Sequence, residues 1–113
     1  MTAPQRGEVW LVSFDPTRGH EQAGARPAVV LSVDSFNSCG ANLVTVLPIT
    51  SKPRAVRTRV EIVPPEGGLT VPSYVICEQT RTIAMERLIK SLGKVSLGTM
   101  GRVSDIVRML LGL

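Results

Sequence analysis

Histidine, cysteine and aromatic residues are scarce in this sequence, and the shortage of histidine and cysteine excludes several classes of functional site. The 113 residues include one histidine, two cysteines and 4% aromatic residues. One histidine excludes an acid–base scheme that needs two. Cys39 and Cys77 lie far apart and form no C-x-x-C pair, so we expect two reduced, partly buried thiols. Without an H-x-x-x-H, D-x-D or Cys/His cluster, the sequence predicts no bound metal and no cofactor.

Long apolar segments are also missing from the sequence. No apolar run reaches the length that a membrane-spanning helix requires. The first residues, M-T-A-P-Q-R-G, lack the apolar core of a signal peptide. We therefore expect no membrane association and a cytoplasmic location.

The residues that are present are sufficient for one basic, compact domain. Hydrophobic residues make up 43% of the chain, and its length fits a single domain over residues 1–113. A domain of this size buries a limited share of its surface, which makes dimerisation a plausible source of further stability. The net charge of +4, from 13 basic and 9 acidic residues, favours a polyanionic partner such as nucleic acid, although many basic proteins bind none.

Hydrophobic patterning predicts a mainly β fold with a late helix. Strands are expected at residues 8–14, 28–33, 43–49, 58–63 and 73–77, with a closing segment at 93–95. Residues 18–25 are expected to form a loop, and 34–42 and 84–89 each to contain a short helical turn. Beyond Ser96, a candidate N-cap, apolar residues recur at three- and four-residue steps until a predicted helix end near Gly112; they are Leu97, Met100, Val103, Val107 and Leu110. This order favours a small antiparallel β barrel or curled sheet with a helix packed against it.

The polar residues at strand ends include the types that the metal-free cleavage of RNA would need. Such cleavage uses the RNA's own 2′-hydroxyl as nucleophile and needs a base, a cationic clamp and a hydroxyl or amide donor. Arg26 directly precedes Pro27 and an apolar strand, so its guanidinium is well placed to bind a phosphate through two N–H donors. Thr50 closes another apolar strand and offers a hydroxyl. The remaining candidates are Glu21, Ser51, Glu78, Gln79 and Arg81.

Each of these residues also has an ordinary structural interpretation. Arg26 fits a solvated or ion-paired surface residue, and Thr50 fits a strand for its β propensity alone. His20 fits a locally hydrogen-bonded loop residue. Arg54, Arg57 and Arg59 fit a solvated basic face. These patterns by themselves predict a small basic barrel and leave nucleic-acid binding open.

Four motifs that occur in order resemble the MazF/PemK family of toxin–antitoxin ribonucleases, in particular its PemK/Kid-like branch. The resemblance extends from residue 6 to about residue 113. The motifs are R-G-E-V-W-L-V-S-F-D-P-T at 6–17, G-H-E-Q-A-G-A-R-P at 19–27 with the strand A-V-V-L-S after it, P-I-T-S at 48–51, and E-Q-T-R-T-I at 78–83; F-N at 36–37 also falls in the family's order.

The resemblance implies both a fold and an activity. The implied fold is mainly β with short helices, a small SH3-like barrel with a C-terminal α-helix that forms a homodimer. The implied function is that of the toxin of a type II toxin–antitoxin system, a metal-independent endoribonuclease that cleaves single-stranded messenger RNA selectively. Its products would carry a 2′,3′-cyclic phosphate and a 5′-hydroxyl. The implied protein partner is a cognate antitoxin whose C-terminal segment blocks the RNA groove.

The resemblance also assigns roles to individual residues. Ile76 stands where Kid-like members carry a catalytic arginine, and Glu78 replaces their aspartate, so we favour a site built on Arg26 and Thr50. The segment K-P-R-A-V-R after Ser51 differs from that of Kid-like members, so no target sequence is implied. Catalytic roles fall on Arg26, Thr50, Glu21 and Glu78. RNA-binding roles fall on His20, Gln22, Ser51, Lys52, Arg54, Gln79 and Arg81.

Two other functions remain open at this stage. The first is a non-enzymatic protein poison with the same fold, resembling CcdB, which targets DNA gyrase. The second is a catalytically degenerate module that only binds nucleic acid. Cleavage of RNA by the purified protein in the presence of EDTA would favour the enzyme over both.

Overall fold

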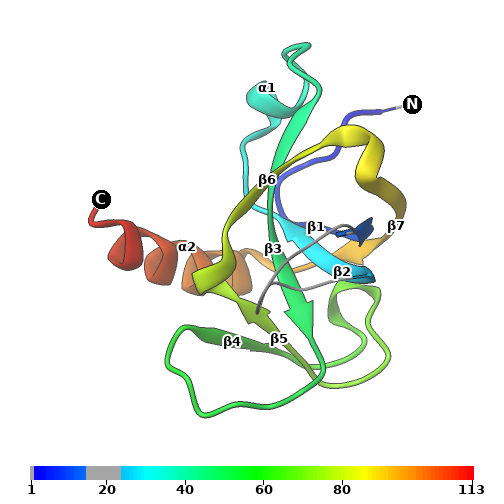
Figure 1. The fold of residues 1–113 in the computed structure, drawn as a ribbon. Coiled ribbons are helices and arrows are strands. Elements are labelled where there is room, and N and C mark those ends of the chain that lie inside the picture. Colours follow the sequence, from blue (N-terminus) through cyan, green and yellow to red (C-terminus); the bar gives the residue numbers. More distant parts are fainter. Residues whose placement is uncertain (1, 15–23) are drawn as a thin grey trace.

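The fold was analysed in a computed structural model, which describes residues 2–14 and 24–113 (Figure 1). Within these residues the chain forms seven strands, two α-helices and three short 3-10 turns. The strands are β1 (Glu8–Ser13), β2 (Ala25–Val30), β3 (Leu43–Thr50), β4 (Arg59–Ile62), β5 (Ser73–Ile76), β6 (Arg81–Ala84) and β7 (Leu88–Lys94). The helical elements are α1 (Asp34–Asn37), α2 (Leu97–Leu111), η1 (Glu66–Gly68), η2 (Cys77–Gln79) and η3 (Met85–Arg87).

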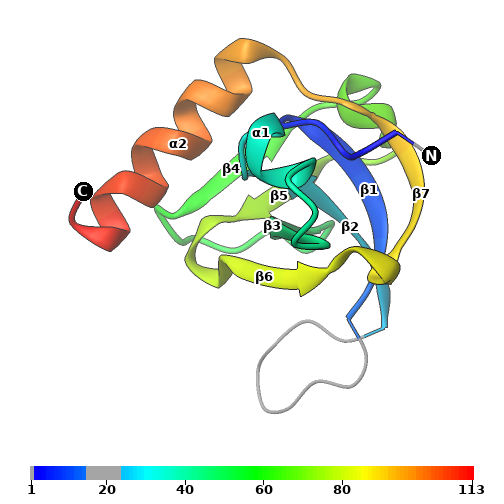
Figure 2. The ribbon, with the colours of Figure 1, turned by 90° about the horizontal axis from the view of Figure 1, so that it is seen from above.

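The strands form one antiparallel sheet that curls around the core (Figure 2). The strand order is β4-β5-β3-β2-β1-β7, and β6 pairs with the first half of β3. In the described residues no pairing joins β4 to β7, so the sheet is strongly curled but not closed. The predicted mainly β fold with a C-terminal helix is confirmed. Of the two predicted forms, a barrel and a curled sheet, the structure has the curled sheet.

Alternation along the strands divides the core into two clusters, one on each face of the sheet. Val9, Val29, Leu47 and Ile49 belong to the first cluster, which α2 covers. Trp10, Val12, Ala28, Val30 and Val46 belong to the second. On β1, β2 and β3 the residues of the second cluster have even numbers. The same face therefore carries Arg26, Pro48 and Thr50, which lie near the ends of their strands.

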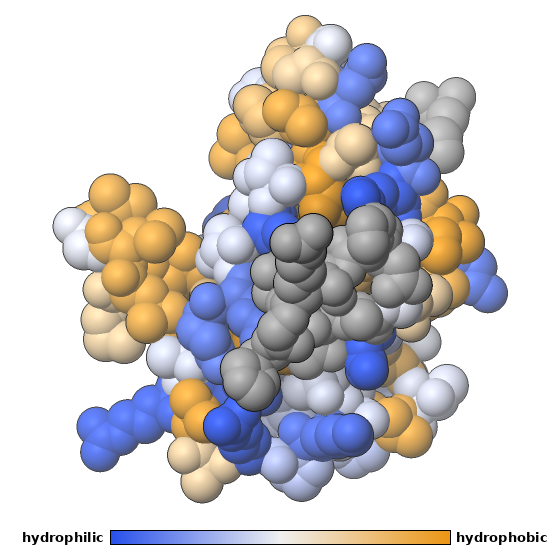
Figure 3. Space-filling view, viewed as in Figure 1, coloured by the Kyte–Doolittle hydropathy of each residue, from blue (hydrophilic) through white to orange (hydrophobic). Residues whose placement is uncertain are grey.

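Helix α2 begins and ends where the sequence predicts. The Ser96 hydroxyl accepts a hydrogen bond from the Thr99 backbone N–H at 3.1 Å, and Gly112 closes the helix with a φ of 71°. The predicted apolar stripe is only partly buried, because Met100, Val103 and Val107 alone reach the core. Leu97 is 91% exposed and Leu110 is 43% exposed. The end of α2 projects as an apolar surface (Figure 3), formed by Met109, Leu110, Leu111 and Leu113.

A glutamate outside α2 stabilises the start of this helix. The Glu66 carboxylate accepts hydrogen bonds from the Ser96 backbone N–H at 2.9 Å and from the Thr99 hydroxyl at 2.6 Å. The hydrogen bond from Thr99 is the main reason that the pKa of Glu66 lies below its ordinary value. A carboxylate at this position also complements the positive end of the helix dipole.

The turn that follows Glu66 packs directly on β7. Gly68 has a φ of +71°, and a Cβ atom built there would lie 1.9 Å from the Leu92 carbonyl oxygen. Only glycine fits such a position. This close approach fixes the start of the segment 69–73, which contributes one wall of the candidate site described below.

Several predicted element boundaries were wrong. The second strand covers Ala25–Val30 instead of 28–33, because Arg26 and Pro27 pair with β1. Residues 81–84 form strand β6, which was not predicted, and β7 begins at Leu88 instead of 93. In β6 the exposed Thr82 faces Thr45, and their hydroxyl oxygens are 2.8 Å apart. Cys77 is buried, but Cys39 is exposed instead of partly buried.

The structure also bears on membrane insertion. None of the helices in the described part of the chain is both long enough and apolar enough to cross a bilayer.

Candidate active site

The register between β2 and β3 brings Arg26 and Thr50 together. The pairing of β2 with β3 ends where Ala28 lies opposite Pro48, and Arg26 and Thr50 each lie two residues beyond that pair, on the same face of their strands. Both residues line one pocket of about 200 Å³, which we call the Arg26–Thr50 pocket. Among the described residues, its lining consists of Arg26, Pro27, Ile49, Thr50, Ser51, Leu69, Thr70, Val71 and Ser73.

The hydroxyl of Thr50 is held in a defined orientation. Thr50 is only 6% exposed and pairs with Tyr74 of β5. Its Oγ1 atom accepts a hydrogen bond from the Lys52 backbone N–H at 3.2 Å. Because this bond occupies a lone pair, the hydroxyl proton remains available for an acceptor in the pocket.

The backbone of Arg26 is fixed, as the sequence predicts. Arg26 pairs with Val12, and Pro27 pairs with Leu11, so β1 holds both residues in the sheet. The Arg26 side chain is half-buried at the pocket wall. A guanidinium in this position supplies a permanent positive charge and planar N–H donors that match a phosphate.

A second pocket lies beside the first along β3. Its volume is about 230 Å³ and it is lined by Pro48, Glu78, Gln79, Thr80 and Arg81; we call it the Glu78–Arg81 pocket. Pro48 lies two residues before Thr50 on the same face of β3, which makes the two pockets neighbours. The guanidinium carbon of Arg81 lies 5.2 Å from the ring centre of the buried Phe14, within range of a cation–π interaction.

The Glu78 carboxylate is bound by neighbouring residues. Arg59 donates from Nη2 and Nε to Oε2 at 2.9 and 3.1 Å, and the Thr58 hydroxyl donates to Oε1 at 2.7 Å. Burial alone raises the pKa of Glu78, but the hydrogen bonds from Arg59 and Thr58 outweigh it, so the pKa lies below its ordinary value. Among the described residues, Arg26 and Thr50 line one pocket and Glu78 lines the neighbouring one. The predicted catalytic residue Glu78 is therefore not in the same pocket as Arg26 and Thr50.

The sequence matches, over residues 5–111, the family of PemK-like, MazF-like toxins of type II toxin–antitoxin systems. The chain belongs to this family. It is 37% identical over 114 residues to the endoribonuclease MazF9 of Mycobacterium tuberculosis (strain ATCC 25618 / H37Rv), which covers 96% of the chain and 97% of the relative. The family prediction from sequence is therefore confirmed.

Solved structures of similar proteins support the same assignment. MazF (Form-I) from Deinococcus radiodurans superposes with a TM-score of 0.86 at 27% identity, covering 98% of each chain. An endoribonuclease from a mycobacterial species, solved in complex with its cognate antitoxin, superposes with a TM-score of 0.78 at 26% identity. That match covers 100% of this chain and 97% of the other.

The remaining predicted site residues of this toxin fall into three groups. Ser51 lines the Arg26–Thr50 pocket, and Gln79 and Arg81 line the neighbouring one. Lys52 and Arg54 are exposed on the segment that follows Thr50. The predicted residues His20, Glu21 and Gln22 lie outside the described residues. Among residues 2–14 and 24–113, no three His, Cys, Asp or Glu side chains gather closely enough to hold a metal ion.

Sequence reasoning missed two contributions to this region of the toxin. Ser73, which is 3% exposed, and the segment 69–71 line the Arg26–Thr50 pocket, although no sequence signal marks them. Arg59 was grouped with a solvated basic face, but its side chain is 9% exposed and binds Glu78. Ile76, which replaces the arginine of Kid-like members, is fully buried in the core.

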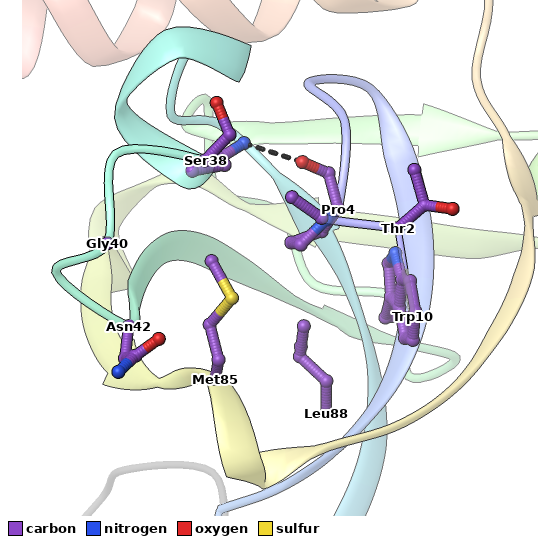
Figure 4. A pocket seen from close by; sticks show the side chains of 10 residues that line it. Thr2, Pro4, Trp10, Ser38, Gly40, Asn42, Met85 and Leu88 are labelled. Atoms are coloured by element: carbon purple, nitrogen blue, oxygen red, sulfur yellow. Dashed lines mark hydrogen bonds between the residues drawn. The ribbon is translucent and has the colours of Figure 1, made fainter.

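A larger hollow lies near the N-terminus and α1, with a different character (Figure 4). Its volume is about 410 Å³, and none of the ten described residues that line it carries a charge. Trp10, Met85 and Leu88 form its apolar wall. The side-chain amide of Asn37, which also lines the hollow, donates to the Pro4 carbonyl at 2.9 Å. Because its described lining residues include no cation, this hollow is less suited to a phosphate than the two pockets along β3, which contain Arg26 and Arg81.

Proposed function

We propose that this toxin is an endoribonuclease that cleaves single-stranded messenger RNA without a metal ion, and that the Arg26–Thr50 pocket is its catalytic site. The observation that carries this proposal is the placement of a guanidinium and an oriented, buried hydroxyl in one pocket. The similarity to MazF9, an endoribonuclease, supports the same activity.

The chemistry of the pocket fits attack by the 2′-hydroxyl of the RNA. The 2′-hydroxyl gives its proton to a base and its oxygen forms a bond to phosphorus as the bond to the 5′-oxygen breaks. The products are a 2′,3′-cyclic phosphate and a 5′-oxygen, which takes up a proton from water to become a 5′-hydroxyl. Negative charge builds on the non-bridging oxygens in the transition state, where donors fixed in advance are most effective. Arg26 binds two of these oxygens and the Thr50 hydroxyl donates to one. Because a guanidinium remains protonated in proteins, we assign Arg26 charge stabilisation and not proton removal.

The general base is assigned to a residue other than Glu78. Glu78 already accepts hydrogen bonds on both oxygens, and its lowered pKa makes it a weak base. We therefore propose Glu21, in the segment 15–23, as the base, with His20 and Gln22 as RNA contacts. Selective recognition of RNA is assigned to residues that flank the scissile phosphate. These are Ser51, Lys52, Arg54, Gln79 and Arg81.

The proposed partners follow from the family and from the surface of α2. An antitoxin protein is proposed because the chain belongs to a toxin–antitoxin family and a similar endoribonuclease was solved with its cognate antitoxin. A homodimer is proposed because Met109, Leu111 and Leu113 expose an apolar surface that association would cover. A cytoplasmic location is proposed because the RNA substrate is there.

The test is cleavage of a long RNA by purified toxin in EDTA, comparing wild type with Arg26→Ala. We expect wild type to cut at defined sites and Arg26→Ala to be slower by about 10²–10³-fold, the usual effect of losing one transition-state donor. Arg108→Ala is the matched control, since Arg108 is exposed in the last turn of α2. Wild-type rates for Arg26→Ala would refute the site, and no cleavage by wild type would favour the non-enzymatic poison.

A further inference from the structure

We infer that Arg59 and Glu78 are positioning residues that anchor a basic RNA-binding segment, residues 51–58, across the two pockets of β3. The inference rests on the proposed function, because it assigns this segment to the RNA substrate. The segment follows Thr50 directly and ends at β4, and it carries the exposed cations Lys52, Arg54 and Arg57.

The structure fixes the basic segment at both of its ends. At its start, the Lys52 backbone N–H donates to the Thr50 hydroxyl in the Arg26–Thr50 pocket at 3.2 Å. At its end, the Thr58 hydroxyl donates to Glu78 Oε1 at 2.7 Å. The Cys77 backbone N–H also donates to the Thr58 carbonyl at 3.2 Å, which extends the β4–β5 pairing by one residue. The two anchors therefore belong to the two neighbouring pockets.

The pair between Arg59 and Glu78 has the geometry of a structural anchor. Arg59 donates from two nitrogens, with Nη2 2.9 Å and Nε 3.1 Å from Glu78 Oε2. The Arg59 side chain is 9% exposed, so its guanidinium is held between β4, Glu78 and the hollow beside α2 that it lines with Arg102 and Asp105. The Glu78 side chain is 32% exposed, so the pair is buried on the arginine side only. Hydrogen bonds between two ionised groups are shorter and stronger than those between neutral groups.

These contacts are poorly suited to proton abstraction. A general base works best when its pKa is near the working pH and its oxygen can approach the proton that it removes. Both Glu78 oxygens already accept hydrogen bonds from the protein. The donors are Thr58, the last residue of the basic segment, and Arg59, the first residue of β4. The carboxylate is therefore placed to hold Thr58 and Arg59 and not to take a proton from the 2′-hydroxyl.

An anchored segment favours RNA binding more than the chemical step. Fixing both ends reduces the conformational entropy that the segment would otherwise lose when it binds RNA. Lys52, Arg54 and Arg57 can then meet successive phosphates beside the scissile one. Release of the Glu78 anchor should therefore raise KM for RNA and leave kcat nearly unchanged.

The test compares Glu78→Gln, Arg59→Gln and Thr58→Val in the full-length toxin. We expect KM for an RNA oligonucleotide to rise about tenfold in the first two variants, since each loses a charge-assisted hydrogen bond, and less in Thr58→Val. The value of kcat and its pH profile should stay within about twofold of wild type. Amide hydrogen exchange in residues 51–58 should become faster in the same order. Glu61→Gln, at an exposed position of β4, is the matched control.

The outcomes separate this inference from the proposed function. A fall in kcat of about 10² or more for Glu78→Gln, with unchanged KM and unchanged exchange in 51–58, would identify Glu78 as the base and overturn the inference. If the wild-type toxin cuts no RNA, the proposed function fails, and Kd for a 2′-O-methyl RNA replaces KM as the readout. Unchanged exchange and unchanged RNA affinity in all three variants would then overturn the anchor itself.

Discussion

The two neighbouring pockets along β3 differ in what one polar side chain of each, Thr50 or Glu78, already contacts. In the Arg26–Thr50 pocket, the Thr50 hydroxyl accepts one hydrogen bond and keeps its proton for a ligand. In the Glu78–Arg81 pocket, the carboxylate is engaged by Arg59 and Thr58. Residue type alone therefore does not assign a catalytic role to a side chain. The contacts that a side chain already makes decide whether it acts on a substrate or holds the protein around it.

The largest change in cleavage rate is expected when the Thr50 hydroxyl is removed. Thr50→Val keeps the shape of the side chain, and we expect the cleavage rate to fall about 10²-fold because one transition-state donor is lost. Thr50→Ser restores the hydroxyl and should recover most of the rate. Single-turnover cleavage of a defined RNA measures both variants. Equal rates for the valine and serine variants would show that the hydroxyl takes no part.

A smaller effect is expected from Arg81 in the neighbouring pocket. Arg81→Ala should weaken RNA binding about tenfold and reduce the slope of log K against log salt by about one, as expected for one lost phosphate contact. The measurement is the dissociation constant of a non-cleavable 2′-O-methyl RNA at several salt concentrations. Phe14→Leu, which removes the ring beneath Arg81 but keeps the charge, serves as the comparison. An unchanged salt slope in Arg81→Ala would exclude a phosphate contact.

The smallest effect concerns the stability that the Glu78 contacts provide. Because the folded-state pKa of Glu78 is lowered from 4.5, its stabilisation is fully present above that value and is lost as the pH falls through the lowered pKa. We expect the melting temperature to fall on acidification and to fall less steeply in Glu78→Gln. Glu66 has a lowered pKa as well, so Glu78→Gln should remove only part of the slope. An identical slope in Glu78→Gln and wild type would contradict this account.

Local signals predicted those parts of the fold in which neighbouring residues determine the structure. Ser96 and Gly112 delimit α2 because a cap depends on side chains within one helical turn. Strand β6 was missed because its sequence, R-T-I-A, is half polar and is a strand only through its pairing with β3. The early start of β2 was missed for the same reason, since Arg26 and Pro27 are held by β1.

The candidate site was predictable only in part, for a related reason. Motif order placed Arg26 and Thr50 together, and the structure brings both into one pocket. The contact between Arg59 and Glu78 was not predictable, because it depends on the register of β4 against β5 across 19 residues of sequence. Ser73 likewise reaches the pocket as the first residue of β5 and is part of no motif.

The most direct test of the central claim is cleavage of an RNA that carries one 2′-O-methyl group at the nucleotide before a mapped scissile bond. Without the 2′-hydroxyl the RNA has no nucleophile at that bond, so the account predicts that this bond stays intact while unmodified sites in the same molecule are cut. Cleavage of the modified bond at the normal rate would contradict the account.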